Sequence, residues 1–131
     1  MMTLLALLLL VGCSDNNLER NTALESDFSS LIAMVSGNSN SEIHISAFID
    51  FEWDKAFLFS PYTPHEELEQ KMGVRFNNPS GIDWREDIYL IVFLHDEIVV
   101  QYAELSREQA DFSISEADYL TPSNDSIIII R

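Results

Sequence analysis

The segment Ile88–Leu94 constrains the fold of this chain more than any other. It reads Ile-Tyr-Leu-Ile-Val-Phe-Leu, which is apolar at nearly every position and rich in β-branched and aromatic residues. A short run of this kind, followed by a tight turn at residues 95–97, is typical of a strand that is covered on both faces. The sequence therefore predicts that this segment is a central strand of a sheet.

The spacing of apolar residues predicts the other elements. A capping box at Thr22–Glu25 precedes apolar residues spaced on one helical face up to Val35, and a second capping box at Thr63–Glu66 precedes a short helix that ends at Gly73. Between Glu42 and Phe51 the apolar residues alternate with polar ones, as in a half-buried strand. Further strands are predicted at 55–59, 98–102, around 112–114 and at 127–130. We expect an α+β domain with two helices and a mostly antiparallel sheet of five or six strands.

The N-terminal segment has features of an export signal. Leu4–Val11 is an uninterrupted apolar run, too short for a transmembrane helix of about 20 residues but of the length found in export signals. The run ends in Leu10-Val11-Gly12-Cys13, and polar residues follow. This sequence resembles the lipobox of bacterial lipoproteins, a family in which the cysteine is lipidated and the preceding peptide is removed.

The resemblance to lipoproteins divides the chain into three parts. We expect residues 1–12 to be a cleaved signal peptide, residues 13–21 a lipidated tether on Cys13, and residues 22–131 a single α+β domain. No Lys or Arg precedes the apolar run, which departs from the basic start of such signals. The family's sorting rule reads the residue after the cysteine. Ser14 predicts the periplasmic face of the outer membrane in a bacterium with two membranes, and the outer face of the cell membrane in a bacterium with one.

Composition excludes several classes of protein. The chain has 131 residues with 7 basic and 22 acidic side chains, a formal net charge of -15, so its surface repels nucleic acid and favours cationic partners. A single cysteine supports neither a disulfide scaffold nor a cysteine-rich zinc module. We expect no cofactor. The expected partners are the membrane, through the lipid on Cys13, and a protein or another envelope component.

The middle of the chain carries a second resemblance. Phe51-Glu-Trp-Asp-Lys55, the aromatic strand Phe57–Phe59 and the helix entry Pro61-Tyr-Thr-Pro64 precede an acidic helix. These motifs resemble a group of small bacterial lipoproteins and secreted proteins, over roughly residues 42–102. The resemblance implies a fold and assigns no activity.

Four residues of these motifs form the candidate binding surface: Trp53, Asp54, Lys55 and Tyr62. In the structural interpretation the tryptophan closes the core, the aspartate accepts turn amides, the lysine pairs with an acid and the tyrosine packs on the sheet. In the functional interpretation, the four residues form an aromatic and carboxylate cluster that faces a ligand.

The chain offers no recognised catalytic or metal motif. Asp50, Glu52 and Asp54 alternate without the glycine of a calcium loop, and His65 with Glu69 lacks the second histidine of a zinc motif. No Gly-x-Ser-x-Gly nucleophile elbow or glycine-rich phosphate loop occurs. We therefore expect no metal site and no catalytic residue, and predict a lipid-anchored binding module. The alternatives are a small envelope hydrolase that uses carboxylates, and an inhibitor or immunity-type protein that binds a basic partner.

Overall fold

The computed structural model describes residues 18–35, 41–114 and 117–131, and it confirms the predicted α+β fold class. The strands form two sheets, of four and three strands, in place of the single sheet expected. Every neighbouring pair is antiparallel except β1 and β5. The larger sheet has the order β1 (Glu19–Arg20), β5 (Ile98–Ser106), β4 (Ile88–His95), β3 (Lys55–Phe59), and the smaller has the order β2 (Ser41–His44), β7 (Ser126–Ile130), β6 (Asp111–Ile114). The helices are α1 (Thr22–Met34) and α2 (His65–Met72), with 3-10 turns η1 (Ile45–Phe48) and η2 (Ile82–Trp84).

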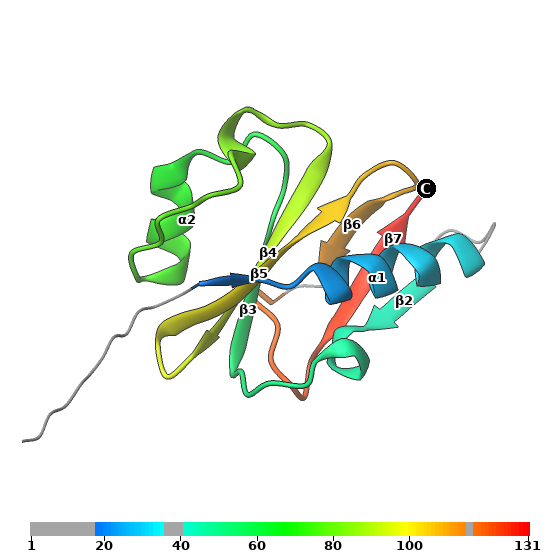
Figure 1. Cartoon of the computed structure of the whole chain (residues 1–131), viewed down its shortest axis with the longest axis horizontal. Coiled ribbons are helices and arrows are strands. Elements are labelled where there is room, and N and C mark those ends of the chain that lie inside the picture. Colours follow the sequence, from blue (N-terminus) through cyan, green and yellow to red (C-terminus); the bar gives the residue numbers. More distant parts are fainter. Residues whose placement is uncertain (1–17, 36–40, 115–116) are drawn as a thin grey trace, which may run out of the picture.

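Strand β4 is covered on both faces, as its sequence predicts. Ile91 and Phe93 belong to one core cluster, which also takes in α1 and the three-stranded sheet. Leu90, Val92 and Leu94 belong to a second cluster, with α2 and the chain that follows it. Figure 1 shows the resulting arrangement, with α2 on one side of β3–β5 and α1 with the smaller sheet on the other.

Helix α1 begins where the sequence predicts but is capped by a different residue. The Oδ1 atom of Asn21 accepts the N–H of Leu24 at 2.9 Å, so Asn21 takes the N-cap position assigned to Thr22. Glu25 does not close a capping box. Its carboxylate instead accepts two bonds from the guanidinium of Arg20 and one from the N–H of Glu104.

The strand predicted at 42–51 is wrong over its second half. Strand β2 ends at His44, and the chain turns into η1 directly afterwards. The Oδ2 atom of Asp125 accepts the N–H of Ser46 at 2.9 Å, while the C=O of Asp125 accepts the N–H of Ile45. A residue far along the chain thus satisfies backbone amides that a longer strand would have used.

The second predicted capping box is also absent. The N-cap of α2 is Pro64, which has no side-chain bond to give, and Thr63 Oγ1 donates to the C=O of Ser60 at 2.6 Å. The predicted end of the helix is confirmed. Gly73 lies at φ 74°, a left-handed conformation that glycine adopts without steric cost.

The β4–β5 hairpin closes at the predicted turn. Its two central residues, Asp96 and Glu97, have φ of 52° and 65°, as in a type I′ turn. Strand β5 runs on to Ser106, beyond the predicted end at Tyr102. Near the N-terminus, Glu19–Arg20 pair with β5 within the segment expected to be a tether.

Candidate functional site

The four residues of the candidate binding surface lie in different surroundings. Trp53 is 8% exposed and packs edge-on against Phe93, with 5.4 Å between the ring centroids. Tyr62 is 56% exposed. Its hydroxyl donates to Glu86 Oε1 at 3.0 Å, and this bond raises the pKa of the tyrosine. Lys55 Nζ lies 5.2 Å from the ring centroid of Tyr119, a cation–π contact.

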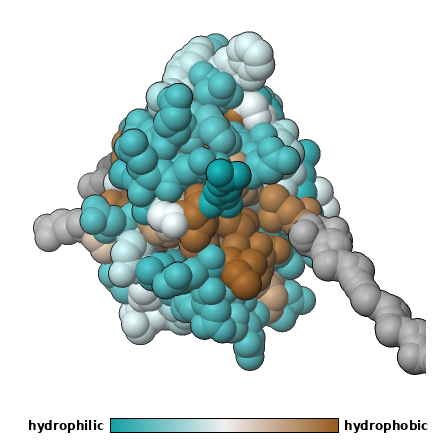
Figure 2. Space-filling view, turned by 90° about the vertical axis from the view of Figure 1, so that its left-hand side faces the viewer, coloured by the Kyte–Doolittle hydropathy of each residue, from teal (hydrophilic) through white to brown (hydrophobic). Residues whose placement is uncertain are grey.

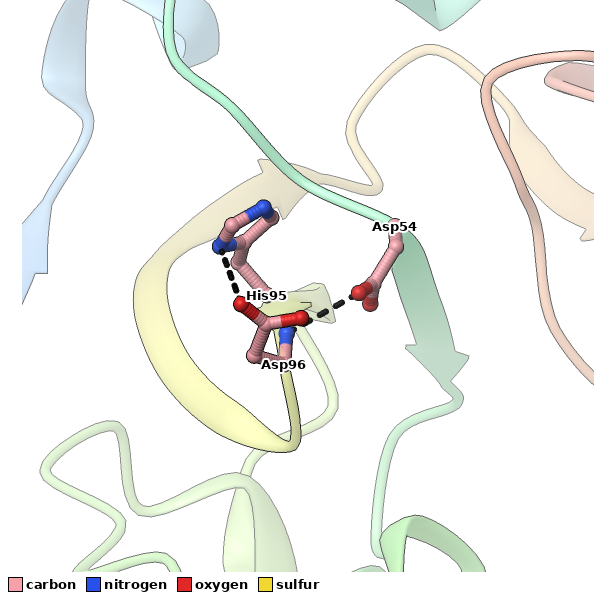
Figure 3. A group of neighbouring side chains, drawn as sticks. All are labelled: Asp54, His95 and Asp96. Atoms are coloured by element: carbon pink, nitrogen blue, oxygen red, sulfur yellow. Dashed lines mark hydrogen bonds and ion pairs between the residues drawn. The ribbon is translucent and has the colours of Figure 1, made fainter.

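Asp54 lies in a small cluster with two residues at the end of the β4–β5 hairpin. Figure 3 shows the carboxylates of Asp54 and Asp96 and the ring of His95 drawn together around the turn. Asp54 Oδ2 accepts the N–H of Asp96 at 2.9 Å, and His95 Nδ1 lies 3.6 Å from Asp96 Oδ2. The other ring nitrogen of His95 lies 3.5 Å from the carboxylate of Glu52.

This cluster is the one place in the described part of the chain where three possible metal ligands converge. One ligand atom from each of Asp54, His95 and Asp96 lies within 4.8 Å of the others. Two carboxylates and an imidazole suit a divalent cation. The Asp54 carboxylate, however, already has a structural task, because it binds the amide of a strained turn. The cluster is therefore explained as a turn support.

Two further residues that the sequence analysis named, His65 and Glu69, do come together. His65 and Glu69 face each other on α2, with 3.2 Å between Nε2 and Oε2. Glu69 Oε2 also accepts the N–H of Phe76, which fastens the chain after α2 to the helix. Cys13, the expected lipidation site, lies outside the described residues.

A polar hollow of about 410 Å³ lies between α1 and β5. Two arginines, two glutamates and an aspartate form a connected ion network in it. Arg20 binds Glu25 at 2.8 Å and Glu104 at 3.3 Å, and Arg85 binds Glu104 at 3.0 Å and Asp87 at 2.8 Å. The bonds to Asp87 and Glu104 raise the pKa of the Arg85 guanidinium against the opposing effect of burial.

The carboxylates of Glu25 and Glu104 in the polar hollow are already bound by other groups. Both oxygens of Glu25 accept bonds, from the guanidinium of Arg20 and from the N–H of Glu104. Oε1 of Glu104 is held by both arginines. Carboxylates engaged in this way join α1 to the sheet and are not free to exchange protons with a substrate.

An apolar groove of about 870 Å³ lies on the side of the molecule that carries α2. One wall is the chain after α2, and the other is the start of β5 together with Leu18. Figure 2 shows a hydrophobic area on this face, framed by hydrophilic residues. The apolar lining residues are Leu18, Val74, Phe76, Pro79, Ile98, Val99 and Tyr102.

Ile98, at the start of β5, is the large apolar residue of the groove that is exposed, at 65%. Phe76 and Tyr102 also line the groove but are buried, with 6.2 Å between their ring centroids. Burial raises the pKa of the Tyr102 phenol. A groove lined by an exposed aliphatic residue and by aromatic rings offers apolar area for contact with another molecule.

The sequence contains a signal for this groove that our sequence analysis did not use. Ile98-Val-Val100 is apolar at three consecutive positions on the second strand of a hairpin, where alternation is the norm. A run of this kind requires cover on both faces or leaves one apolar face open.

Comparison with protein-family models, with curated proteins and with solved structures found no match to this chain. The functional assignment therefore depends on the site itself.

Proposed function

We propose that this protein is a lipid-anchored envelope protein that acts as a binding module, and that the apolar groove is its binding surface. The observation that carries the proposal is the 65% exposure of Ile98 in a groove that the buried Phe76 and Tyr102 also line. Exposed apolar surface framed by polar residues marks interaction sites in soluble domains. The groove replaces the Trp53–Tyr62 surface as the preferred site, because Trp53 is buried.

Attachment through Cys13 is the expected route to the membrane. In the part of the chain that the structure describes, no helix is both long and apolar enough to cross a bilayer. Four residues lie between Cys13 and Leu18, which lines the groove. The five residue steps from Cys13 to Leu18 span at most about 18 Å when extended. A lipid on Cys13 would hold the groove close to the membrane surface.

Binding is favoured over catalysis by the state of the carboxylates. Glu25 and Glu104 of the polar hollow are held by arginines, and Asp54 accepts a turn amide. The hydrolase alternative requires carboxylates that are free to transfer protons. A binding function of the groove requires only apolar side chains that a partner can reach.

The anchor is tested by the intact mass of the chain extracted from bacterial membranes. We expect a diacyl or triacyl modification on Cys13 and loss of residues 1–12. A chain that keeps Met1, or a Cys13→Ser variant that stays in the membrane fraction to the same extent, contradicts the anchor.

The groove is tested by photo-crosslinking in the source cell envelope. A photoreactive phenylalanine analogue replaces Ile98, and in a control chain it replaces Met34, a position on α1 that is even more open, at 77% exposed. We expect a defined crosslinked species from position 98 and none from position 34. Equal crosslinking from both positions contradicts a specific surface.

A further inference from the structure

We infer that the occupant of the apolar groove is a cationic amphipathic segment of a partner protein, with apolar side chains at its centre and Lys or Arg at its margins. This inference rests on the proposed binding function and specifies the chemistry of the partner. Two observations carry it: the apolar centre of the groove, and the charges that continue each of its walls.

The hairpin wall ends in acids. Glu97 lines the groove beside Ile98, and Asp96 is exposed next to it in the same turn. The left-handed backbone at both positions fixes these two acids at the tip of the hairpin. A cation at this margin of the occupant would meet the carboxylate of Glu97, with Asp96 next to it in the turn.

The opposite wall is also continued by acids. Val74 and Arg75 belong both to the groove and to an adjoining hollow of about 500 Å³, which Glu66 and Glu69 also line. Arg75 is the single basic residue lining the groove in the described part of the chain, and it lies between these glutamates and the apolar centre. With two glutamates against one arginine, the margin beyond Val74 carries a net negative charge.

The net charge of the whole chain also favours a cationic partner. A formal net charge of -15 creates a negative potential that attracts cationic partners and speeds their encounter. The same potential repels anionic lipid headgroups and nucleic acid. An uncharged apolar ligand would fill the centre of the groove but make no use of the acids on its two walls. A segment that is apolar in the middle and basic at the ends would contact both the apolar centre of the groove and the acids on its walls.

The experiment uses the full chain in zwitterionic lipid nanodiscs and two synthetic amphipathic helical peptides. The peptides carry the same Leu face, with Lys on the polar face of one and Glu on that of the other. We expect the Lys peptide to bind at least tenfold more tightly than the Glu peptide, with affinity that falls as salt rises. Empty nanodiscs provide the blank for direct peptide binding to lipid.

Two pairs of variants assign the binding to the groove. Ile98→Ser removes apolar contact and should weaken the Lys peptide about tenfold, while Met34→Ser leaves it unchanged. Glu97→Gln should weaken it about threefold, and Asp27→Asn on α1 should not. Thermal unfolding of each variant verifies that it is folded.

The outcomes separate this inference from the proposed function. Equal affinity for both peptides, lost in Ile98→Ser, overturns the cationic partner and keeps the groove as a binding surface. Binding of neither peptide overturns both. A polarity-sensitive label on Ile98→Cys that shifts to the blue when the chain enters a nanodisc without peptide identifies the lipid surface as the occupant, and that result also overturns the inference.

Discussion

Asp54 supports the turn of the β4–β5 hairpin through its side chain, since Oδ2 accepts the N–H of Asp96 at 2.9 Å. The backbone of Asp54 is tied to the same hairpin, because its N–H donates to the C=O of Leu94 at 2.8 Å. The residue before β3 thus holds both the last part of β4 and the turn. This connection joins the edge strand β3 to the hairpin that carries one wall of the groove.

Replacing Asp54 with alanine should weaken this connection. We expect Asp54→Ala to lower the free energy of unfolding by about 1.5 kcal/mol, the lower end of the net value of a hydrogen bond to a charged group. Denaturation in urea measures the change. Asp50→Ala, which removes an exposed acid from the same stretch, is the control and should stay within about 0.5 kcal/mol of the natural chain. Equal effects of the two substitutions would contradict a stabilising role of the bond between Asp54 and the turn.

The turn itself is strained at Glu97. Its φ of 65° lies in the left-handed region, where a residue with a Cβ is disfavoured by roughly 1–2 kcal/mol. Glu97→Gly should therefore stabilise the chain by about 0.5–1 kcal/mol after the entropy cost of glycine is included. The reverse change at Gly73, at φ 74° with no atom within 4 Å of an added Cβ, should destabilise by a similar amount. A Gly73→Ala variant of unchanged stability would show that backbone strain is not the cause.

The strands and helices that the sequence predicted well are those whose signal is local. Ile88–Leu94 is apolar on both faces, and its short length with β-branched and aromatic residues favours a buried strand over a buried helix. Glycine at residue 73 ends α2 for a reason internal to its own backbone. Strand 42–51 failed because its end depends on Asp125, whose approach to Ser46 no nearby residue reveals. The caps failed because Asn21 and Thr22 are both suitable, and only the fold selects one.

The candidate site was harder to predict for the same reason. Asp54 could be identified as a turn acceptor, but its partner His95-Asp96 lies about forty residues later in sequence. The groove draws its walls from Leu18, the segment after α2 and the start of β5, so its shape exists only after folding. The run Ile98-Val-Val100 was its one local trace.

Asp125 should make stability depend on pH. Burial raises the pKa of its carboxyl, but the bonds from His44, at 3.0 Å, and from Ser46 outweigh burial and lower it. A lowered folded-state pKa contributes stability that is present above the unfolded value of about 3.9 and is lost as pH falls toward the folded value. The natural chain should exceed Asp125→Asn by about 1–2 kcal/mol at pH about 5, and the difference should shrink below pH about 4. Urea denaturation over this range tests it, and a difference that is constant down to pH about 2 would contradict it.

Arg85 should not tolerate lysine. Its guanidinium makes two parallel bonds to Asp87, at 2.9 and 2.8 Å, and further bonds to Glu104 and to the C=O of Ser80. An ammonium group cannot make this set of planar contacts. We expect Arg85→Lys to lose about 1 kcal/mol in urea denaturation, although the charge is unchanged. Arg75→Lys, at an exposed position, is the matched control and should stay within about 0.5 kcal/mol.

Trp53 and Tyr62 should separate a core residue from a surface residue. Trp53 is 8% exposed and contacts Phe93 edge-on, so Trp53→Ala leaves a cavity and should cost about 3–5 kcal/mol. Tyr62→Phe removes only the exposed hydroxyl that donates to Glu86, and should change stability by less than about 0.5 kcal/mol. Thermal unfolding, with near-ultraviolet circular dichroism for packing, measures both. If Trp53→Ala unfolds like the natural chain yet loses a partner, the tryptophan belongs to a binding surface after all. If it is destabilised as expected, any binding it loses reflects folding, and the groove at Ile98 is the surface to follow.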